Sequence, residues 1–143
     1  RLLRGAWLGH PVHPLLVTVP IGAWVCSAVL DVGFGDRAAA RRLVLVGLAA
    51  TPPTVLLGLA DFSHLDVPQR RVGALHAVVN TLAAGCFLAS TRCGDRAARV
   101  WGLVGLLVLS AGGALGGHLS YAQGSGVGRW QEEARVPAVD GPW

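Results

Sequence analysis

Five histidines lie at the ends of long apolar stretches in this 143-residue chain. His10 and His13 open the first stretch, His64 follows the second, His76 starts the third, and His118 lies toward the end of the fourth. If the stretches are antiparallel membrane helices, all five imidazoles lie on one side of the bilayer. Neutral imidazole is a ligand for haem iron, zinc, copper and non-haem iron. Ionisable groups in membrane segments usually serve a function, so this placement predicts a cofactor or metal site.

The elements that must position these histidines are membrane helices. The chain is 52% hydrophobic and 14% charged, which is too little charge to cover the surface of a soluble domain. Four stretches lack Asp, Glu, Lys and Arg entirely: residues 5–30, 43–60, 72–91 and 100–128. Each has about 18 residues or more, enough to cross the hydrocarbon core of a bilayer. We therefore expect an all-α integral membrane protein.

The predicted transmembrane domain covers residues 1–122, and an extended polar tail is expected at 123–143. Within the domain, the expected spans are about 14–31, 43–60, 72–91 and 100–121. Asp36 is expected to cap the second helix at its N-terminus. The adjacent Pro52 and Pro53 remove two amide donors, so we expect a kink or local unwinding near mid-membrane.

An internal repeat relates the two halves of the chain. Gly35-Asp36-Arg37-Ala38-Ala39 recurs as Gly94-Asp95-Arg96-Ala97-Ala98, each time ahead of an arginine and an apolar helix. Such copies predict two helical hairpins related by a pseudo-twofold axis, with chance similarity of Ala/Arg-rich sequence as the alternative. Short loops favour an up-down four-helix bundle, in which the first and third spans are diagonal. His13 and His76 are then expected to face each other across the bundle axis.

Three histidines are expected to form a shared site: His13, His76 and His118. A b-type haem needs only two facing imidazoles and a gap. Zinc, copper or non-haem iron would take three or four ligands, and His10 would complete that set. Two stacked haems would need histidines on both membrane sides, which the chain lacks. The alternative, strongest for His10 and His64, is hydrogen bonding to backbone carbonyls or lipid headgroups.

Four further residues are predicted to surround the cofactor. Asn80 follows His76 by one helical turn and could orient a ligand or bond to a substrate. Asp61 is expected to orient a histidine or to balance the charge of the cofactor. An equally open alternative is that Asp61 caps the C-terminus of its helix and bonds to the loop. Gly113 and Gly117 would leave room for a flat cofactor, while close helix packing is the alternative.

The membrane orientation rests on arginines, because the chain has no lysine. Each side carries six of them, so the positive-inside count is tied. The short loops after the first and third spans contain the arginines of one side, with few acidic residues beside them. We therefore expect those loops in the cytoplasm and the histidines outside. The chain begins at Arg1 and contains no methionine, so we expect native sequence upstream.

Several of these segments resemble a bacterial membrane family known as domain of unknown function 2231. They are Gly9-His10-Pro11-Val12-His13-Pro14, the step Gly58-Leu59-Ala60-Asp61, His76, and Gly116-Gly117-His118-Leu119. The resemblance extends through about Gly128. Members of this family are sometimes fused or neighbouring to Rieske-type iron–sulfur domains, which implies electron transfer. This sequence has no Rieske cysteine–histidine motif, so such a partner would be a separate protein or an extension.

The expected function is a membrane-embedded redox subunit of the bacterial inner membrane. It would hold a b-type haem or another histidine-bound metal near one face, and pass electrons between a partner protein and the quinone pool. The alternative is an accessory or scaffold subunit of a larger membrane complex, with a structural metal or no cofactor. No nucleophile–base pair is recognisable, so a stand-alone enzyme is not favoured.

The arginines beside the spans indicate topology signals and lipid phosphate contacts rather than nucleic acid binding.

Overall fold

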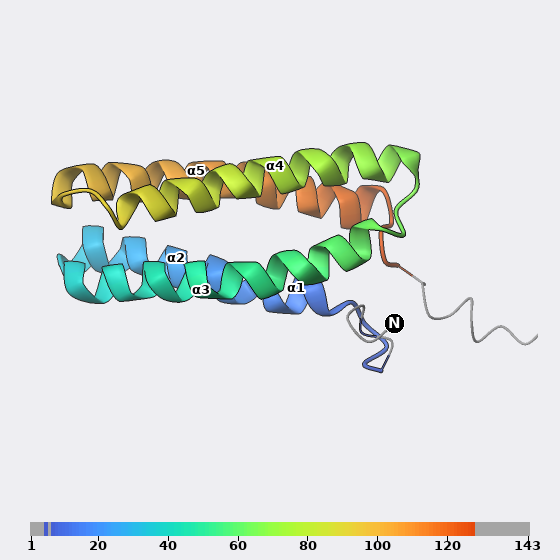
Figure 1. Cartoon of the computed structure of the whole chain (residues 1–143), viewed down its shortest axis with the longest axis horizontal. Coiled ribbons are helices and arrows are strands. Elements are labelled where there is room, and N and C mark those ends of the chain that lie inside the picture. Colours follow the sequence, from blue (N-terminus) through green and yellow to red (C-terminus); the bar gives the residue numbers. More distant parts are fainter. Residues whose placement is uncertain (1–4, 6, 128–143) are drawn as a thin grey trace, which may run out of the picture.

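The computed structural model describes residues 5 and 7–127. Helices α1 (Val12–Leu16) and α2 (Thr18–Ala28) lead into the π-helix η1 (Val29–Phe34). Then follow α3 (Arg37–Phe62), α4 (Val67–Ser90), α5 (Asp95–Gly117) and the π-helix η2 (His118–Ala122) (Figure 1). The predicted tail at 123–143 lies largely outside the described residues.

Four helical segments are long and apolar enough to cross a membrane: Val12–Phe34, Arg37–Phe62, Val67–Ser90 and Asp95–Ala122. Their outer surfaces are rich in large apolar side chains, such as Leu107, which is 74% exposed. Such a surface is suited to lipid rather than to water. The prediction of an all-α, four-helix membrane protein is confirmed.

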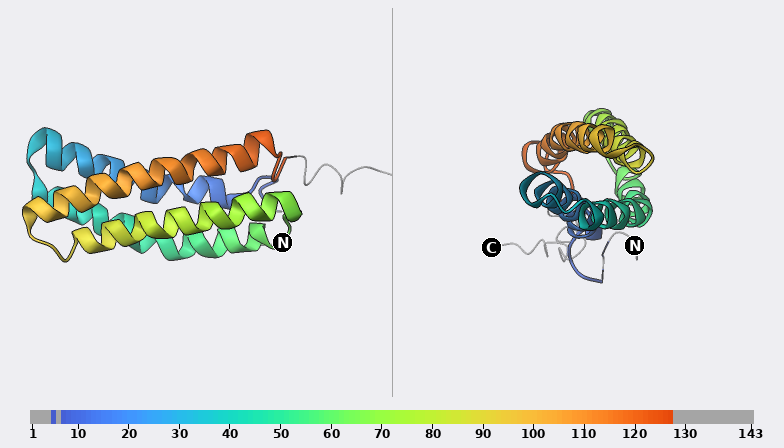
Figure 2. Two further views of the ribbon diagram at one scale, coloured as in Figure 1. Left: turned by 90° about the horizontal axis from the view of Figure 1, so that it is seen from above. Right: turned by 90° about the vertical axis from the view of Figure 1, so that its left-hand side faces the viewer.

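The helices form two antiparallel hairpins, α2–α3 and α4–α5, that lie on one another as layers (Figure 1). Seen along the bundle axis, the helices follow the order α2, α3, α4, α5 around a ring (Figure 2). Contacts between the hairpins join α2 to α5 and α3 to α4. Helices α2 and α4 are therefore diagonal, as the short loops predicted.

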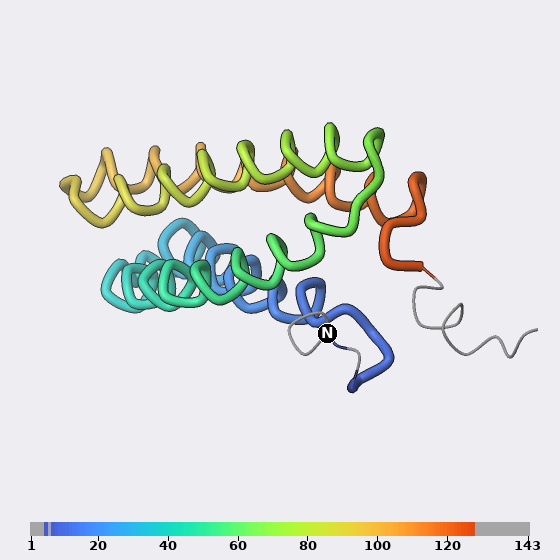
Figure 3. The backbone as a smooth tube through the Cα atoms, turned by 45° about the vertical axis from the view of Figure 1, so that its right-hand side comes forward, coloured from blue at the N-terminus to red at the C-terminus, as the bar shows by residue number. Residues whose placement is uncertain are grey.

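The bundle has two chemically distinct ends. At the histidine end (residues 10–13, 63–66 and 118–127), the α3–α4 connection links the two layers (Figure 3). The arginine end (residues 35–42 and 91–99) contains the α2–α3 and α4–α5 loops. The chain order produces these two ends. Both hairpin loops lie at the arginine end, so the connection between the hairpins lies at the histidine end.

The internal repeat extends into the packing of the bundle core. A Cβ on Gly47 of α3 would collide with the indole of Trp24, coming within 2.7 Å of Cδ1. A Cβ on Gly105 of α5 would lie 3.0 Å from Cε2 of Phe87. The two rings then stack across the α2–α4 diagonal, with centroids 4.1 Å apart and planes 13° apart. Each hairpin thus seats one aromatic ring on one glycine, and the two rings join the hairpins.

Two local predictions for α3 have different outcomes. The Asp36 carboxylate accepts a hydrogen bond from a first-turn backbone N–H at 2.9 Å, so the predicted cap is confirmed. Of the kink or local unwinding expected at Pro52 and Pro53, the unwinding is wrong, because α3 continues through both residues. The kink stays a prediction. Both prolines are exposed, and the hydroxyls of Thr51 and Thr54 donate to carbonyls four residues earlier at 2.9 and 2.8 Å. Such hydroxyl bonds help a membrane helix tolerate proline.

Candidate functional site

His13 is held against α3 by one hydrogen bond and one glycine. Its Nδ1 lies 2.9 Å from the carbonyl oxygen of Thr54. One turn further along α3, a Cβ on Gly58 would lie 2.9 Å from His13 Cε1. A carbonyl oxygen only accepts, so Nδ1 carries the proton and Nε2 of the neutral ring keeps its lone pair. No other described residue forms a hydrogen bond with this ring.

The second hairpin repeats this arrangement around His76. Its Nδ1 lies 2.9 Å from the carbonyl oxygen of Gly112 in α5. A Cβ on Gly116 would lie 2.9 Å from His76 Cε1. The bond therefore fixes the same tautomer, with Nδ1 as donor and Nε2 as the unprotonated nitrogen. Two imidazoles in equivalent settings, one from each hairpin, make up the candidate site.

The two rings belong to faces that meet at the bundle axis. His13 precedes Trp24 by eleven residues, and His76 precedes Phe87 by eleven. Eleven residues are close to three helical turns, or about 16 Å. Because Trp24 and Phe87 stack across the diagonal, the histidines lie on the same helix faces, toward the histidine end.

Asn80 distinguishes the two halves of the site. Its Nδ2 donates to the carbonyl oxygen of His76 at 2.8 Å and lies 3.4 Å from His76 Nε2, which is long for a hydrogen bond. A Cβ on Gly112 would lie 2.6 Å from Asn80 Oδ1. The corresponding position in the first hairpin is occupied by the apolar Val17. Only the His76 side therefore has an amide beside the ring.

The other predicted histidines lie apart from this pair. His118 is exposed at the start of η2, two residues past Gly116 and so about 200° around the helix. His10 is exposed ahead of α1, and His64 is exposed with Nδ1 2.8 Å from Ser63 Oγ. Within residues 5 and 7–127, no three His, Cys, Asp or Glu side chains gather to hold a metal ion. His10, His64 and His118 are thus exposed, whereas His13 and His76 each bond to the facing helix of their own hairpin.

The glycines around the site differ by one position from the expected pair. A Cβ on Gly113 would have no neighbour within 4 Å, and one on Gly117 would approach only Tyr121, at 4.0 Å. The glycines that adjoin Asn80 and His76 are instead Gly112 and Gly116. Both glycine pairs have the same spacing of four residues, and neighbouring residues point about 100° apart around the helix. The spacing alone therefore did not show which pair faces His76.

Asp61 is the last of the predicted residues to be placed, and two further residues of α3 that were not predicted contact His13. Asp61 is half-buried in the last turn of α3. Thr54 and Gly58, which contact His13, were not predicted as site residues. The signal for Gly58 was present, because Leu57-Gly58 corresponds to Leu115-Gly116 in the repeat once the extra alanine of the first copy, Ala40, is skipped.

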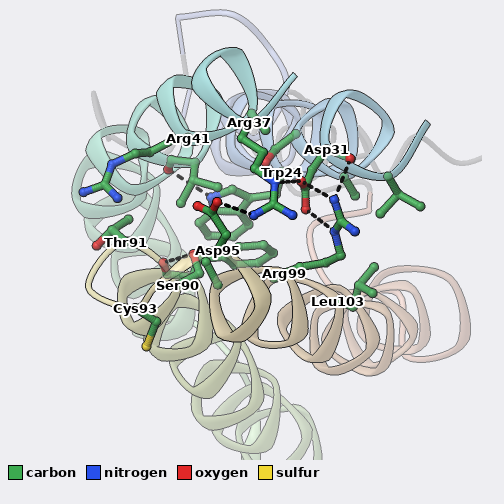
Figure 4. A pocket seen from close by; sticks show the side chains of 18 residues that line it. Trp24, Asp31, Arg37, Arg41, Ser90, Thr91, Cys93, Asp95, Arg99 and Leu103 are labelled. Atoms are coloured by element: carbon green, nitrogen blue, oxygen red, sulfur yellow. Dashed lines mark hydrogen bonds and ion pairs between the residues drawn. The ribbon is translucent and has the colours of Figure 1, made fainter. Parts of the chain in front are cut away.

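A second polar cluster, not predicted from the sequence, joins the hairpins at the arginine end (Figure 4). Arg99 of α5 donates through Nε and Nη2 to the two carboxylate oxygens of Asp31 at 2.9 and 3.0 Å. Its Nη2 also donates to the Asp31 carbonyl oxygen at 3.1 Å. Arg37 of α3 pairs with Asp95 of α5 at 2.7 Å. These two ion pairs connect one hairpin to the other, so the cluster fastens this end of the bundle. Within the first hairpin, Arg37 Nε also lies 3.7 Å from Asp31 Oδ1.

Substituting Asp31 with asparagine is expected to weaken the bundle. The change removes the charge from a side chain that is 17% exposed and leaves Arg99 without its bidentate partner. Hydrogen bonds to charged groups contribute about 1.5–3 kcal/mol, and exposure of Arg99 reduces that, so we expect a loss of about 1–2 kcal/mol. Reversible unfolding in mixed detergent–SDS micelles would measure it. The control is Asp36→Asn, because asparagine caps helices as well as aspartate does; equal losses would contradict the prediction.

The comparison with known families gives one match. The sequence profile of a family described as "Predicted membrane protein (DUF2231)" matches residues 9–129. The match includes all four membrane helices and both histidine–carbonyl pairs. No curated protein and no solved structure is significantly similar to the chain.

Proposed function

The chain belongs to the DUF2231 family of predicted membrane proteins, and on that premise we propose that it is a membrane-embedded redox subunit. In this proposal the Nε2 atoms of His13 and His76 hold a b-type haem. Copper and non-haem iron are alternative redox-active occupants that would use the same donor atoms. Zinc could use those atoms too, but it has no redox chemistry and would fit only the accessory function described below. A bound haem would supply one-electron redox chemistry.

The observation that carries the proposal is the pair of Nδ1–carbonyl hydrogen bonds. Histidines that bind a metal usually donate their other ring N–H to a carbonyl or carboxylate, which fixes the tautomer and the ring orientation. His13 and His76 both do this at 2.9 Å, in equivalent places of the two hairpins. The chain therefore offers two neutral, oriented imidazoles, which is the donor set of a bis-histidine haem.

The surroundings of the pair support a role in electron transfer. The apolar exterior places lipid, and any quinone dissolved in it, next to the bundle. The pair lies toward the histidine end, where a peripheral protein could approach it. We propose that a partner protein, with a Rieske-type protein as the candidate, exchanges electrons with the quinone pool through this subunit. The clustered arginines support a bacterial inner membrane orientation with the arginine end in the cytoplasm.

A second candidate function is an accessory or scaffold subunit. It is favoured by the fact that each histidine bonds to the other helix of its own hairpin. In this second function, the bonds have a structural role alone: they hold α1 to α3 and α4 to α5. In that case His13 and His76 are structural, and the chain binds a structural metal or none.

An optical spectrum distinguishes the two functions. The protein would be purified in mild detergent from haem-replete bacterial cells, and its reduced-minus-oxidised spectrum recorded together with its iron, zinc and copper content. We expect a Soret band, an α-band and iron in proportion to the protein. Material with neither a chromophore nor a bound metal would contradict the redox proposal and leave the scaffold function.

A further inference from the structure

A cavity of about 100 Å³ lies between the hairpins at the arginine end. Trp24 and Phe87 border it toward the middle of the bundle. Apolar residues and a group of polar side chains from both hairpins line the rest. Figure 4 labels Asp31, Arg37, Arg41, Asp95 and Arg99 among the polar ones, and Ser27 also belongs to the lining. A single water needs only about 10–15 Å³ on this measure, so the cavity admits a group of several atoms.

We propose that this cavity binds a phosphate group, and that the phosphate belongs to the headgroup of an anionic phospholipid. The same chemistry could come from a water-soluble phosphate ester, which the experiment below distinguishes. The site is separate from the histidine pair, since Trp24 and Phe87 stand between the two.

The charges of the cavity favour an anion. Its three arginines outnumber its two aspartates, and both carboxylates are already engaged. Asp31 accepts two hydrogen bonds from Arg99, and Asp95 pairs with Arg37. Arg41 has no hydrogen bond or ion pair with any other described residue. After the internal pairs are formed, one positive charge therefore remains.

The free hydrogen-bonding groups of the cavity are mainly donors. The Ser27 hydroxyl has no hydrogen bond to any other described residue, whereas the corresponding Ser90 hydroxyl donates to the Phe87 carbonyl at 2.6 Å. Arg37 and Arg99 each keep a terminal nitrogen outside their ion pairs. A ligand that satisfies these groups must be rich in acceptors, and a phosphate has three or four acceptor oxygens.

The position of the cavity favours a lipid as the source of the phosphate. It lies beside the loops that end the membrane helices, the level at which lipid phosphates are found. Val32 and Leu103 also line it, and both are exposed on the apolar exterior. A headgroup held among the arginines could therefore extend its acyl chains over that surface. Basic pockets between membrane helices bind anionic headgroups in this way.

The test measures lipid retained by the intact protein. Protein in nanodiscs of phosphatidylcholine with a minor fraction of phosphatidylglycerol would be analysed by native mass spectrometry. We expect phosphatidylglycerol to be enriched on the protein, and Arg41→Gln to lower that enrichment about tenfold or more, the effect of losing one hydrogen bond between charged groups. Arg42→Gln is the matched control, because Arg42 is exposed in the same turn of α3 but does not line the cavity.

A second arm identifies the source of the phosphate. Glycerol 3-phosphate is added in excess to the same nanodiscs. No displacement of phosphatidylglycerol supports a lipid site, while displacement that is lost in Arg41→Gln points to a soluble phosphate ester at the same cavity. Equal effects of Arg41→Gln and Arg42→Gln, or no enrichment of phosphatidylglycerol with no binding of glycerol 3-phosphate, would overturn the proposal.

Discussion

Replacing either His13 or His76 with glutamine is expected to abolish cofactor binding while the bundle still folds. A glutamine side chain is a good helix former, and its amide can still donate to the carbonyl of Thr54 or Gly112. It cannot supply an imidazole nitrogen to haem iron. If the two histidines hold a haem, loss of one of them is therefore expected to remove the Soret and α-bands. The measurement is the spectrum of each purified variant, normalised to protein.

The exposed histidines provide the controls for this experiment. His64→Gln should retain the wild-type spectrum, because His64 lies in the α3–α4 connection with its Nδ1 beside Ser63. His118→Gln should also retain it if His13 and His76 are the ligands. Loss of the bands in His118→Gln with retention in His13→Gln would move the ligand set to His118. Unchanged stability in every glutamine variant would show that the spectral loss is not a loss of fold.

The membrane architecture could be predicted from the sequence because its signals are strong and local. Long runs without charge leave few alternatives to membrane helices. Short loops then fix which helices are neighbours. The diagonal relation of α2 and α4 followed, and with it the expectation that His13 and His76 face one axis. The packing agrees, since Trp24 and Phe87 stack across that diagonal.

The carbonyl partners of the histidines and the glycines beside them could not be predicted from the sequence, because both depend on how each helix is rotated about its axis. His13 and His76 bond to backbone carbonyls, and every residue has such a group. Gly113, predicted to leave room for a cofactor, and Gly112, which adjoins Asn80, differ by one residue, which turns the helix face by about 100°. Only the position of the neighbouring ring decides that rotation.

The arginine end shows a different limit. Asp31 lies close to the end of an apolar run, and nothing nearby in sequence indicates its partner Arg99. Their pairing arises because α2 lies beside α5 in the folded bundle. The repeat did contain a usable signal, since Arg41 and Arg99 precede equivalent segments, Leu45-Val46-Gly47 and Leu103-Val104-Gly105. In the structure one of these equivalent arginines is paired and the other is not, which is where the two halves have diverged.

Replacing Gly47 with alanine is expected to cause the largest loss of stability of any glycine-to-alanine change in α3, α4 or α5. The added Cβ would collide with the indole of Trp24. That ring is buried, donates to the Val44 carbonyl at 3.3 Å and stacks on Phe87, so it cannot move without separating the hairpins. Overpacking of this kind costs about 1–3 kcal/mol, and we expect about 2 kcal/mol after the gain in helix propensity.

Two matched substitutions distinguish this steric effect from a general effect of alanine. Gly105→Ala should cost less than Gly47→Ala, because its Cβ would lie 3.0 Å from the edge of Phe87 and a small shift of the ring relieves the contact. Gly85→Ala should be neutral or stabilising by up to about 1 kcal/mol, because that Cβ would have no neighbour within 4 Å. Unfolding of the three variants in detergent–SDS mixtures ranks them. If Gly47→Ala were as stable as Gly85→Ala, the seating of Trp24 on α3 would be wrong, and with it the register that directs His13 and His76 to the bundle axis.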